Sequence, residues 1–220
     1  AEANTTANNI TAIGYAALNA NTTGADNTAV GKNALDLNTT GSQSVAVGVD
    51  ALGAQVDTHY NTAIGHSALM ASIASSNTAV GFSALTANTT GYDNTYVGKG
   101  AGDSVTTGYA NTGIGAGAGG GVSTAIYNIA IGSGAAGSSN GNYNITMSYG
   151  ALASVGTAQQ NIGIGFRTGE STNRNSNTLV GVYAARYPMV TQCVAIGSAT
   201  MYGVADSTAD VDGCTAVGTS

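Results

Sequence analysis

The feature that most constrains this chain is a five-residue motif, Asn-Thr-Ala-(Ile or Val)-Gly, that recurs from one end to the other. It stands at 27–31, 61–65 and 77–81, and as Asn-Thr-Gly-Ile-Gly at 111–115. We call the glycine that closes each motif the anchor. The anchors are Gly14, Gly31, Gly48, Gly65, Gly81, Gly98, Gly115, Gly132, Gly165, Gly181, Gly197 and Gly218, and Ser148 takes the anchor position in one further unit.

The spacing of the anchors predicts the fold class. Successive units are 16 or 17 residues apart, except for a last interval of 21. This period is too short for a propeller blade or a helical repeat, but it fits one coil of a parallel β-solenoid. We therefore expect an all-β chain in which residues 1–8 lead into a single solenoid domain, 9–220, of about 13 coils. Coils stacked at ~4.8 Å would extend over roughly 60 Å.

Two columns of β-branched residues predict a short strand in each unit. Val30 and Val47 precede their anchors by one position, and Thr28 and Val45 precede them by three. Residues two positions apart share one face of a strand. We expect this face to be buried between coils, and the opposite face of alanine and glycine to meet partner chains. A second short extended segment and a polar turn, often Asn-Thr-Thr-Gly, would complete each coil.

The first position of the motif is asparagine in most units, which predicts a ladder of amides along the stacked coils. Cys193 and Cys214 take this position in the last two units. Neighbouring coils ~4.8 Å apart fall within the ~4.4–6.8 Å between Cα atoms that a disulfide tolerates. The sequence therefore allows a disulfide between these two residues, with two small buried thiols as the alternative.

The motif, over residues 9–218, resembles the head repeats of YadA-like trimeric autotransporter adhesins and the similar repeats of phage tail fibres. This resemblance implies a left-handed parallel β-roll that assembles as an intertwined or side-by-side homotrimer. The unit of mostly 17 residues is longer than the adhesin unit, and coiled-coil heptads are absent. These departures favour a fibre segment over an autotransporter.

Composition and motifs argue against several classes of function. Five basic and eleven acidic residues give a net charge of −6, so we expect no nucleic-acid partner. No run of 18 apolar residues occurs, so we expect no membrane insertion. His59 and His66 have no third ligand at the spacing of a zinc site. We expect no enzymatic activity, no cofactor and no metal.

The sequence favours a structural and adhesive fibre segment: a phage tail fibre shaft or receptor-binding region that contacts host surface glycans. A bacterial trimeric surface adhesin head, or a self-assembling extracellular filament subunit, is the alternative. The expected location is the virion tail or the cell surface, and the expected partners are further copies and a glycan or protein receptor. Aromatic rings beside polar side chains can stack on sugars, although they could instead plug corners of the roll or pack between protomers. The candidate glycan contacts are Tyr15, Tyr60, Phe82, Tyr92, Tyr109, Tyr149 and Phe166.

Overall fold

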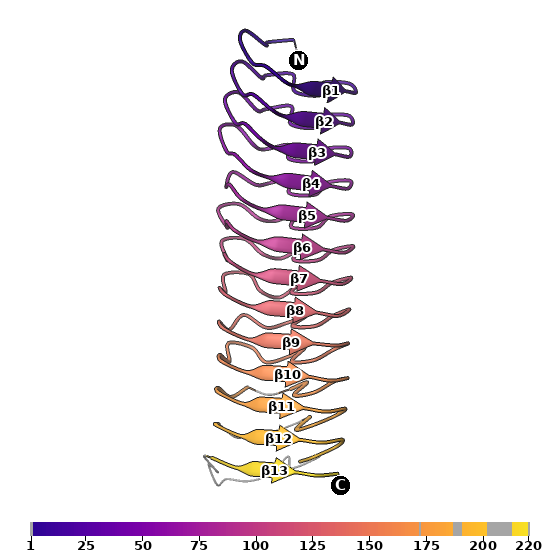
Figure 1. The fold of residues 1–220 in the computed structure, drawn as a ribbon, viewed down its shortest axis with the longest axis vertical. Coiled ribbons are helices and arrows are strands. Elements are labelled where there is room, and N and C mark those ends of the chain that lie inside the picture. Colours follow the sequence, from indigo (N-terminus) through magenta and orange to yellow (C-terminus); the bar gives the residue numbers. More distant parts are fainter. Residues whose placement is uncertain (1, 172, 187–190, 202–212, 220) are drawn as a thin grey trace. The chain divides into compact units, whose positions relative to one another are not determined.

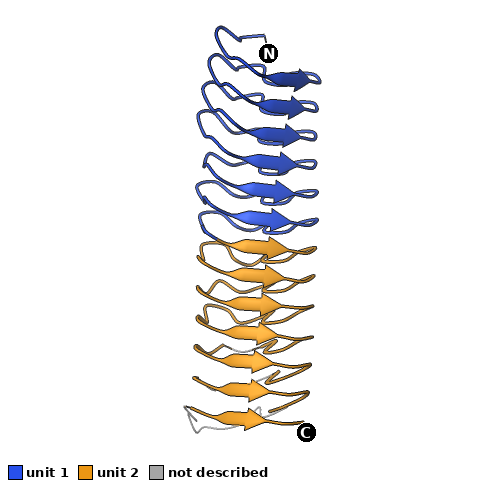
Figure 2. Cartoon of the chain, in the orientation of Figure 1, with its two compact units in different colours: residues 1–110 blue, residues 111–220 orange. Residues whose placement is uncertain are grey.

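The computed structural model describes residues 2–171, 173–186, 191–201 and 213–219. The chain divides into two compact units, unit 1 (residues 1–110) and unit 2 (residues 111–220), shown in Figure 2. Each unit is a parallel β-solenoid in which every repeat supplies one three-residue strand, placed directly before the anchor (Figure 1).

The strands follow the repeats in chain order. Those of unit 1 are β1 (Thr11–Ile13), β2 (Thr28–Val30), β3 (Val45–Val47), β4 (Thr62–Ile64), β5 (Thr78–Val80) and β6 (Thr95–Val97). Those of unit 2 are β7 (Thr112–Ile114), β8 (Ile129–Ile131), β9 (Ile145–Met147), β10 (Ile162–Ile164), β11 (Thr178–Val180), β12 (Val194–Ile196) and β13 (Thr215–Val217).

Consecutive strands within each unit pair in parallel and in register. Val30 lies beside Val47, and Val47 lies beside Ile64, so the β-solenoid predicted from the period is confirmed. The register is kept where the spacing falls to 16, since Thr62 pairs with Thr78. The missing residue is therefore taken from a turn. A shift inside a strand would have moved every side chain to the opposite face.

The predicted orientation of the strands is wrong. The central alanines point into the coil, and Ala29 and Ala46 are fully buried. The β-branched residues point outward instead, with Ile64 and Ile114 about two-fifths exposed at 41% and 42%. The alanine and glycine face is thus the lining of each coil and does not meet a partner. We call the outward residues the outer ladder: Ile13, Val30, Val47, Ile64, Val80 and Val97 in unit 1, and Ile114, Ile131, Met147, Ile164, Val180, Ile196 and Val217 in unit 2.

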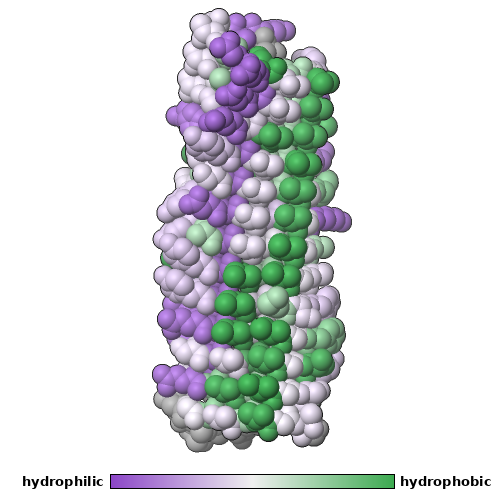
Figure 3. Space-filling view, in the orientation of Figure 1, coloured by the Kyte–Doolittle hydropathy of each residue, from purple (hydrophilic) through white to green (hydrophobic). Residues whose placement is uncertain are grey.

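The physical reason for this orientation is the thin interior of each coil. Leucines four residues after the anchor fill it from the wall opposite the strand, and alanine is the side chain that fits against them. These leucines are Leu18, Leu35, Leu52, Leu69, Leu85 and Leu152, all fully buried. Figure 3 shows hydrophobic surface left in a stripe over the strands of each unit, where the outer ladder lies.

Large and small inward residues exchange places in a few coils. Tyr96 replaces the central alanine of β6, and Gly102 then stands where leucine is usual. A Cβ atom on Gly102 would lie 2.7 Å from Cδ1 of Tyr96. Gly163 in β10 likewise faces Leu152, whose Cγ would lie 2.6 Å from an added Cβ. At both places a large side chain lies against a glycine, as close packing requires.

The segment after the anchor is not the second short extended segment that we predicted. Residues two and four positions after the anchor are left-handed, as at Ala16 (φ 55°) and Leu18 (φ 50°). Left-handed leucine is uncommon, so local propensity does not predict it. Hydrogen bonds to the next coil continue without a strand, because the Leu18 N–H donates to the Ala34 carbonyl at 3.0 Å. The Leu35 N–H donates to Ala51 in the same way, at 3.1 Å.

The anchors are glycines because adjacent coils approach closely there. Gly48 has a φ of 135°, and a Cβ on it would lie 2.4 Å from the Gly65 carbonyl oxygen. Ser148 holds the anchor position of its coil with a φ of 110°. It is therefore the one anchor that keeps a side chain in a region that favours glycine.

Candidate functional site

The asparagine column links each coil to the one that follows. Asn27 is fully buried; its Oδ1 accepts the Ser44 N–H at 3.0 Å, and its Nδ2 donates to the Gly41 carbonyl at 2.7 Å. In unit 2 some links run directly between amides, as from Asn128 Nδ2 to Asn111 Oδ1 at 3.1 Å. The predicted ladder of amides is thus present in part, and most of its links run from side chain to backbone.

One coil of unit 1 shows how this column tolerates a change. Ser44 takes the asparagine position, and its Oγ still accepts the Asn61 N–H of the next coil, at 3.3 Å. Gln55 adds further links: its Nε2 donates to the Ser44 Oγ at 3.3 Å, and its Oε1 accepts a bond from Asn61 Nδ2 at 2.9 Å. All three side chains are buried. A serine and a glutamine together replace what two asparagines do elsewhere.

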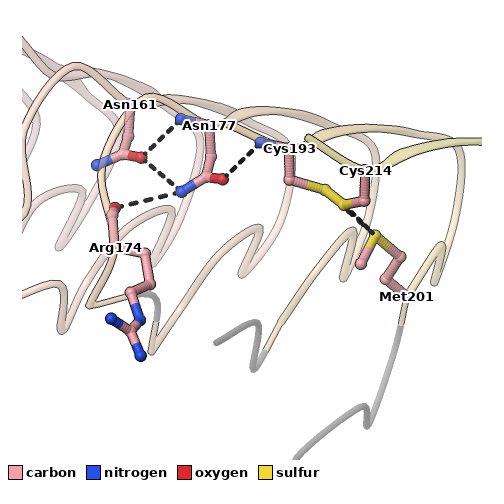
Figure 4. Close-up of a disulfide and its surroundings, with 6 residues drawn as sticks. All are labelled: Asn161, Arg174, Asn177, Cys193, Met201 and Cys214. Carbon is pink, nitrogen blue, oxygen red and sulfur yellow. Dashed lines mark hydrogen bonds between the residues drawn. A yellow bond between two sulfur atoms is a disulfide. The ribbon is translucent and has the colours of Figure 1, made fainter. Parts of the chain in front are cut away.

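A disulfide continues the column in unit 2 (Figure 4). The Cys193 N–H donates to Asn177 Oδ1 at 3.0 Å, and Cys193 is joined to Cys214 with 4.7 Å between their Cα atoms. The Met201 sulfur lies 3.4 Å from the Cys193 Sγ and 3.7 Å from the Cys214 Sγ. A covalent bond therefore takes over from the amide links across the longest interval in the repeat.

The candidate glycan contacts occupy three positions of the repeat and do not form one site. Tyr15, Phe82, Tyr149 and Phe166 follow an anchor, Tyr60 directly precedes a motif, and Tyr92 and Tyr109 stand two positions before one. All are exposed except Tyr109, which is half-buried.

Several of these rings stack between adjacent coils. Tyr92 and Tyr109 lie nearly parallel with centroids 4.7 Å apart, and Tyr149 stacks on Phe166 at 5.6 Å. Phe82 stacks on His66 at 5.4 Å. The rings therefore form separate exposed patches along each unit.

Sequence reasoning missed a group of charged residues beside one of these patches. Residues 1–110 carry seven acidic and two basic side chains, whereas residues 111–201 carry one acidic and three basic ones. The acidic residue, Glu170, accepts a hydrogen bond from Arg186 Nε at 2.7 Å. The Arg186 guanidinium also lies over the Tyr183 ring, 5.1 Å from its centroid. The available signal was the period, because Glu170 and Arg186 are 16 residues apart and so face each other on adjacent coils.

Two titratable groups are shifted by their surroundings. Partial burial, together with the nearby Asp50, raises the pKa of Asp36 above its usual 3.8. Burial raises the pKa of the Tyr96 hydroxyl well above its ordinary value. Burial is the largest cause of both shifts, so both report on packing.

No three His, Cys, Asp or Glu side chains in the described ranges are placed to hold a metal ion together. The same ranges include no helix long and apolar enough to cross a membrane. Comparison with protein-family models, with curated proteins and with solved structures finds no match.

Proposed function

We propose that this chain is a shaft or receptor-binding segment of an adhesive fibre, most simply a phage tail fibre. Three copies lie side by side, and their outer surface contacts glycans of the host cell. The observation that carries this proposal is the outer ladder, a row of apolar side chains that points away from the core on the coils of each unit.

The size of the outer ladder supports contact between copies. A three-residue strand is about 10 Å long, so the six strands of unit 1 or the seven of unit 2, at ~4.8 Å spacing, cover about 300 Å². Apolar patches of a few hundred Å² mark interaction surfaces in soluble proteins. A stable interface buries about 800 Å² on each partner, so the ladder forms its centre and flanking residues supply the rest. The number of three copies rests on the resemblance to YadA-like heads.

The rest of the surface suits adhesion. The aromatic patches lie outside the outer ladder, and their stacked, exposed rings offer contacts for sugars. Hydrogen bonds between neighbouring coils stiffen each unit without a large core. A fibre needs this stiffness and surface, and it needs no catalytic turnover.

The assembly is tested by sedimentation equilibrium and native mass spectrometry at micromolar concentration. We expect a species of three times the 21.4 kDa chain mass. Ile64→Lys in the outer ladder should shift it to monomer, because a charge would be buried at the contact. Leu37→Lys is the matched control, since Leu37 is 51% exposed and lies in a turn. A wild-type chain that stays monomeric at these concentrations would overturn the assembly.

Adhesion is tested with the assembled protein on an array of bacterial surface polysaccharides. We expect binding to a subset of these glycans that is kept in Leu37→Lys. A trimer that binds none of them, and that also fails to label intact bacterial cells, would refute the adhesive role while leaving the fibre assembly in place.

A further inference from the structure

The surface of unit 2 has a step at the positions directly after the anchors. Ala116 and Ser133 follow the anchors of the β7 and β8 coils, and both are exposed. The next residues, Gly117 and Gly134, are left-handed, and a Cβ on either would meet no atom within 4 Å. Two adjacent coils therefore present a low floor, about 10 Å along the unit.

At the next coil an exposed aromatic ring borders this floor. Tyr149 follows Ser133 in this column and is 50% exposed. Its ring stacks on Phe166 on the far side, with 15° between the planes. Within the described ranges, Tyr149 stacks on this ring alone, and its neighbour toward the floor is a serine. One face of the Tyr149 ring is therefore open toward the floor.

The Arg167 side chain lies beside this pair of rings, and its guanidinium carbon is 5.8 Å from the centroid of Phe166. The Cγ of Arg167 lies 3.4 Å from where a Cβ on Gly150 would be, so the arginine stem crosses the coil of Tyr149. The Arg167 Nε is 3.6 Å from a Glu170 oxygen, which is too long for a hydrogen bond. Glu170 is instead bonded to Arg186, whose side chain is 17% exposed against 36% for Arg167. The guanidinium donors of Arg167 are thus available to a ligand.

We propose that this step binds a sugar unit that carries a carboxylate, as in an acidic polysaccharide. The apolar face of the sugar ring packs on Tyr149, and Arg167 receives the carboxylate in a bidentate pair. Ser133 and Gly134 leave room for the ring. This inference rests on the proposed adhesive function, and it names the glycan class and the place of contact.

The equivalent column of unit 1 lacks these features and serves as a comparison. Phe82 holds the position of Tyr149, but His66 stacks on it from the preceding coil. The residue before His66 in the column is Val49, which is also exposed. No floor of small residues adjoins a ring there, so Phe82 should not contribute to the same binding.

The experiment measures calorimetric binding of a trigalacturonate to the full assembled chain, with its methyl ester as the neutral probe. We expect the acid to bind at least tenfold more tightly than the ester. Arg167→Gln should weaken acid binding about tenfold or more, because a charge-assisted pair is lost. Tyr149→Ser, which copies Ser133, should weaken both probes. Leu37→Ser, at an exposed turn residue outside the aromatic patches, should change neither.

A second variant tests the site without changing Tyr149 or Arg167. Gly134→Asn raises the floor, and asparagine tolerates this backbone because Asn33 holds the equivalent position with a φ of 56°. It should abolish binding while the thermal melt stays that of the wild type. Equal affinity for acid and ester, or full binding by Gly134→Asn or Arg167→Gln, would overturn the inference. Array binding that survives these substitutions refutes this site alone, whereas a trimer that binds no glycan refutes the adhesive function as well.

Discussion

Removal of one buried asparagine tests the linkage between coils directly. Asn27→Ala deletes the acceptor of the Ser44 N–H and one of two donors to the Gly41 carbonyl. That carbonyl keeps its bond from Asn38 Nδ2 at 2.9 Å, so it stays partnered. The Ser44 N–H lies inside the coil and loses the bond that Asn27 provided.

The magnitude follows from this difference between the two groups. A buried donor left without its bond costs about 1–3 kcal/mol, and loss of the second bond to Gly41 costs about 0.5–1.5 kcal/mol. We therefore expect Asn27→Ala to lower the free energy of unfolding by about 1.5–4.5 kcal/mol. Since 1.4 kcal/mol corresponds to a factor of ten, protection of the Ser44 amide should fall at least ~10-fold.

Hydrogen exchange is the suitable assay, because a solenoid need not unfold in a single step. The Ser44 amide should exchange much faster, whereas the amide of Val45, which donates to the Asn61 carbonyl, should change less. Thr40→Ala in an exposed turn is the control. If Asn27→Ala matched Thr40→Ala in stability and left Ser44 protected, the asparagine column would not be what links the coils.

Three further substitutions test other features of the coil. Ser148→Gly should raise the melting temperature by relieving a φ of 110°, a strain of about 1–3 kcal/mol, and a lower value would refute this. Gly102→Ala should destabilise by about 1–3 kcal/mol, because the Tyr96 ring must shift, and an unchanged urea midpoint would show that the interior has spare room. Asp36→Asn should stabilise the chain at neutral pH, because burial and Asp50 disfavour the carboxylate in the folded state. In urea titrations below pH 3.8 it should give no gain, because Asp36 is then protonated in both the folded and the unfolded state. An equal gain at both pH values would contradict this.

The period predicts the strands and their register, because each motif repeats the same hydrogen-bonding pattern at one position of the coil. It does not predict which face is inside. Alternation tells which residues share a face, and the choice between the faces depends on what lies across the coil. Leu52 and its equivalents fill that space, so Ala46 must face them and Val47 must point outward. The exchange of Tyr96 with Gly102 is a sequence signal for this arrangement.

The step in unit 2 could be predicted from the sequence only in part. Tyr149 and Phe166 stand out as aromatic residues, but the contribution of Arg167 depends on its stem crossing Gly150. That path is set by the left-handed turns after the anchor, which local propensity does not predict. Application of the period to charged residues would have paired Glu170 with Arg186 and so identified Arg167 as the less tightly held cation.

Inside each unit, the oxygen of a column asparagine accepts a backbone N–H of the coil that follows, as for Asn61 with Asn77 and Asn144 with Asn161. A chain built this way can gain or lose one whole coil inside a unit and still offer every amide the same kind of partner. Where residues of two coils depend on each other, as Ser44, Gln55 and Asn61 do, those coils must be inserted or deleted together. The number of coils in a unit can therefore change during evolution by duplication of single repeats, while each existing coil is inherited unchanged.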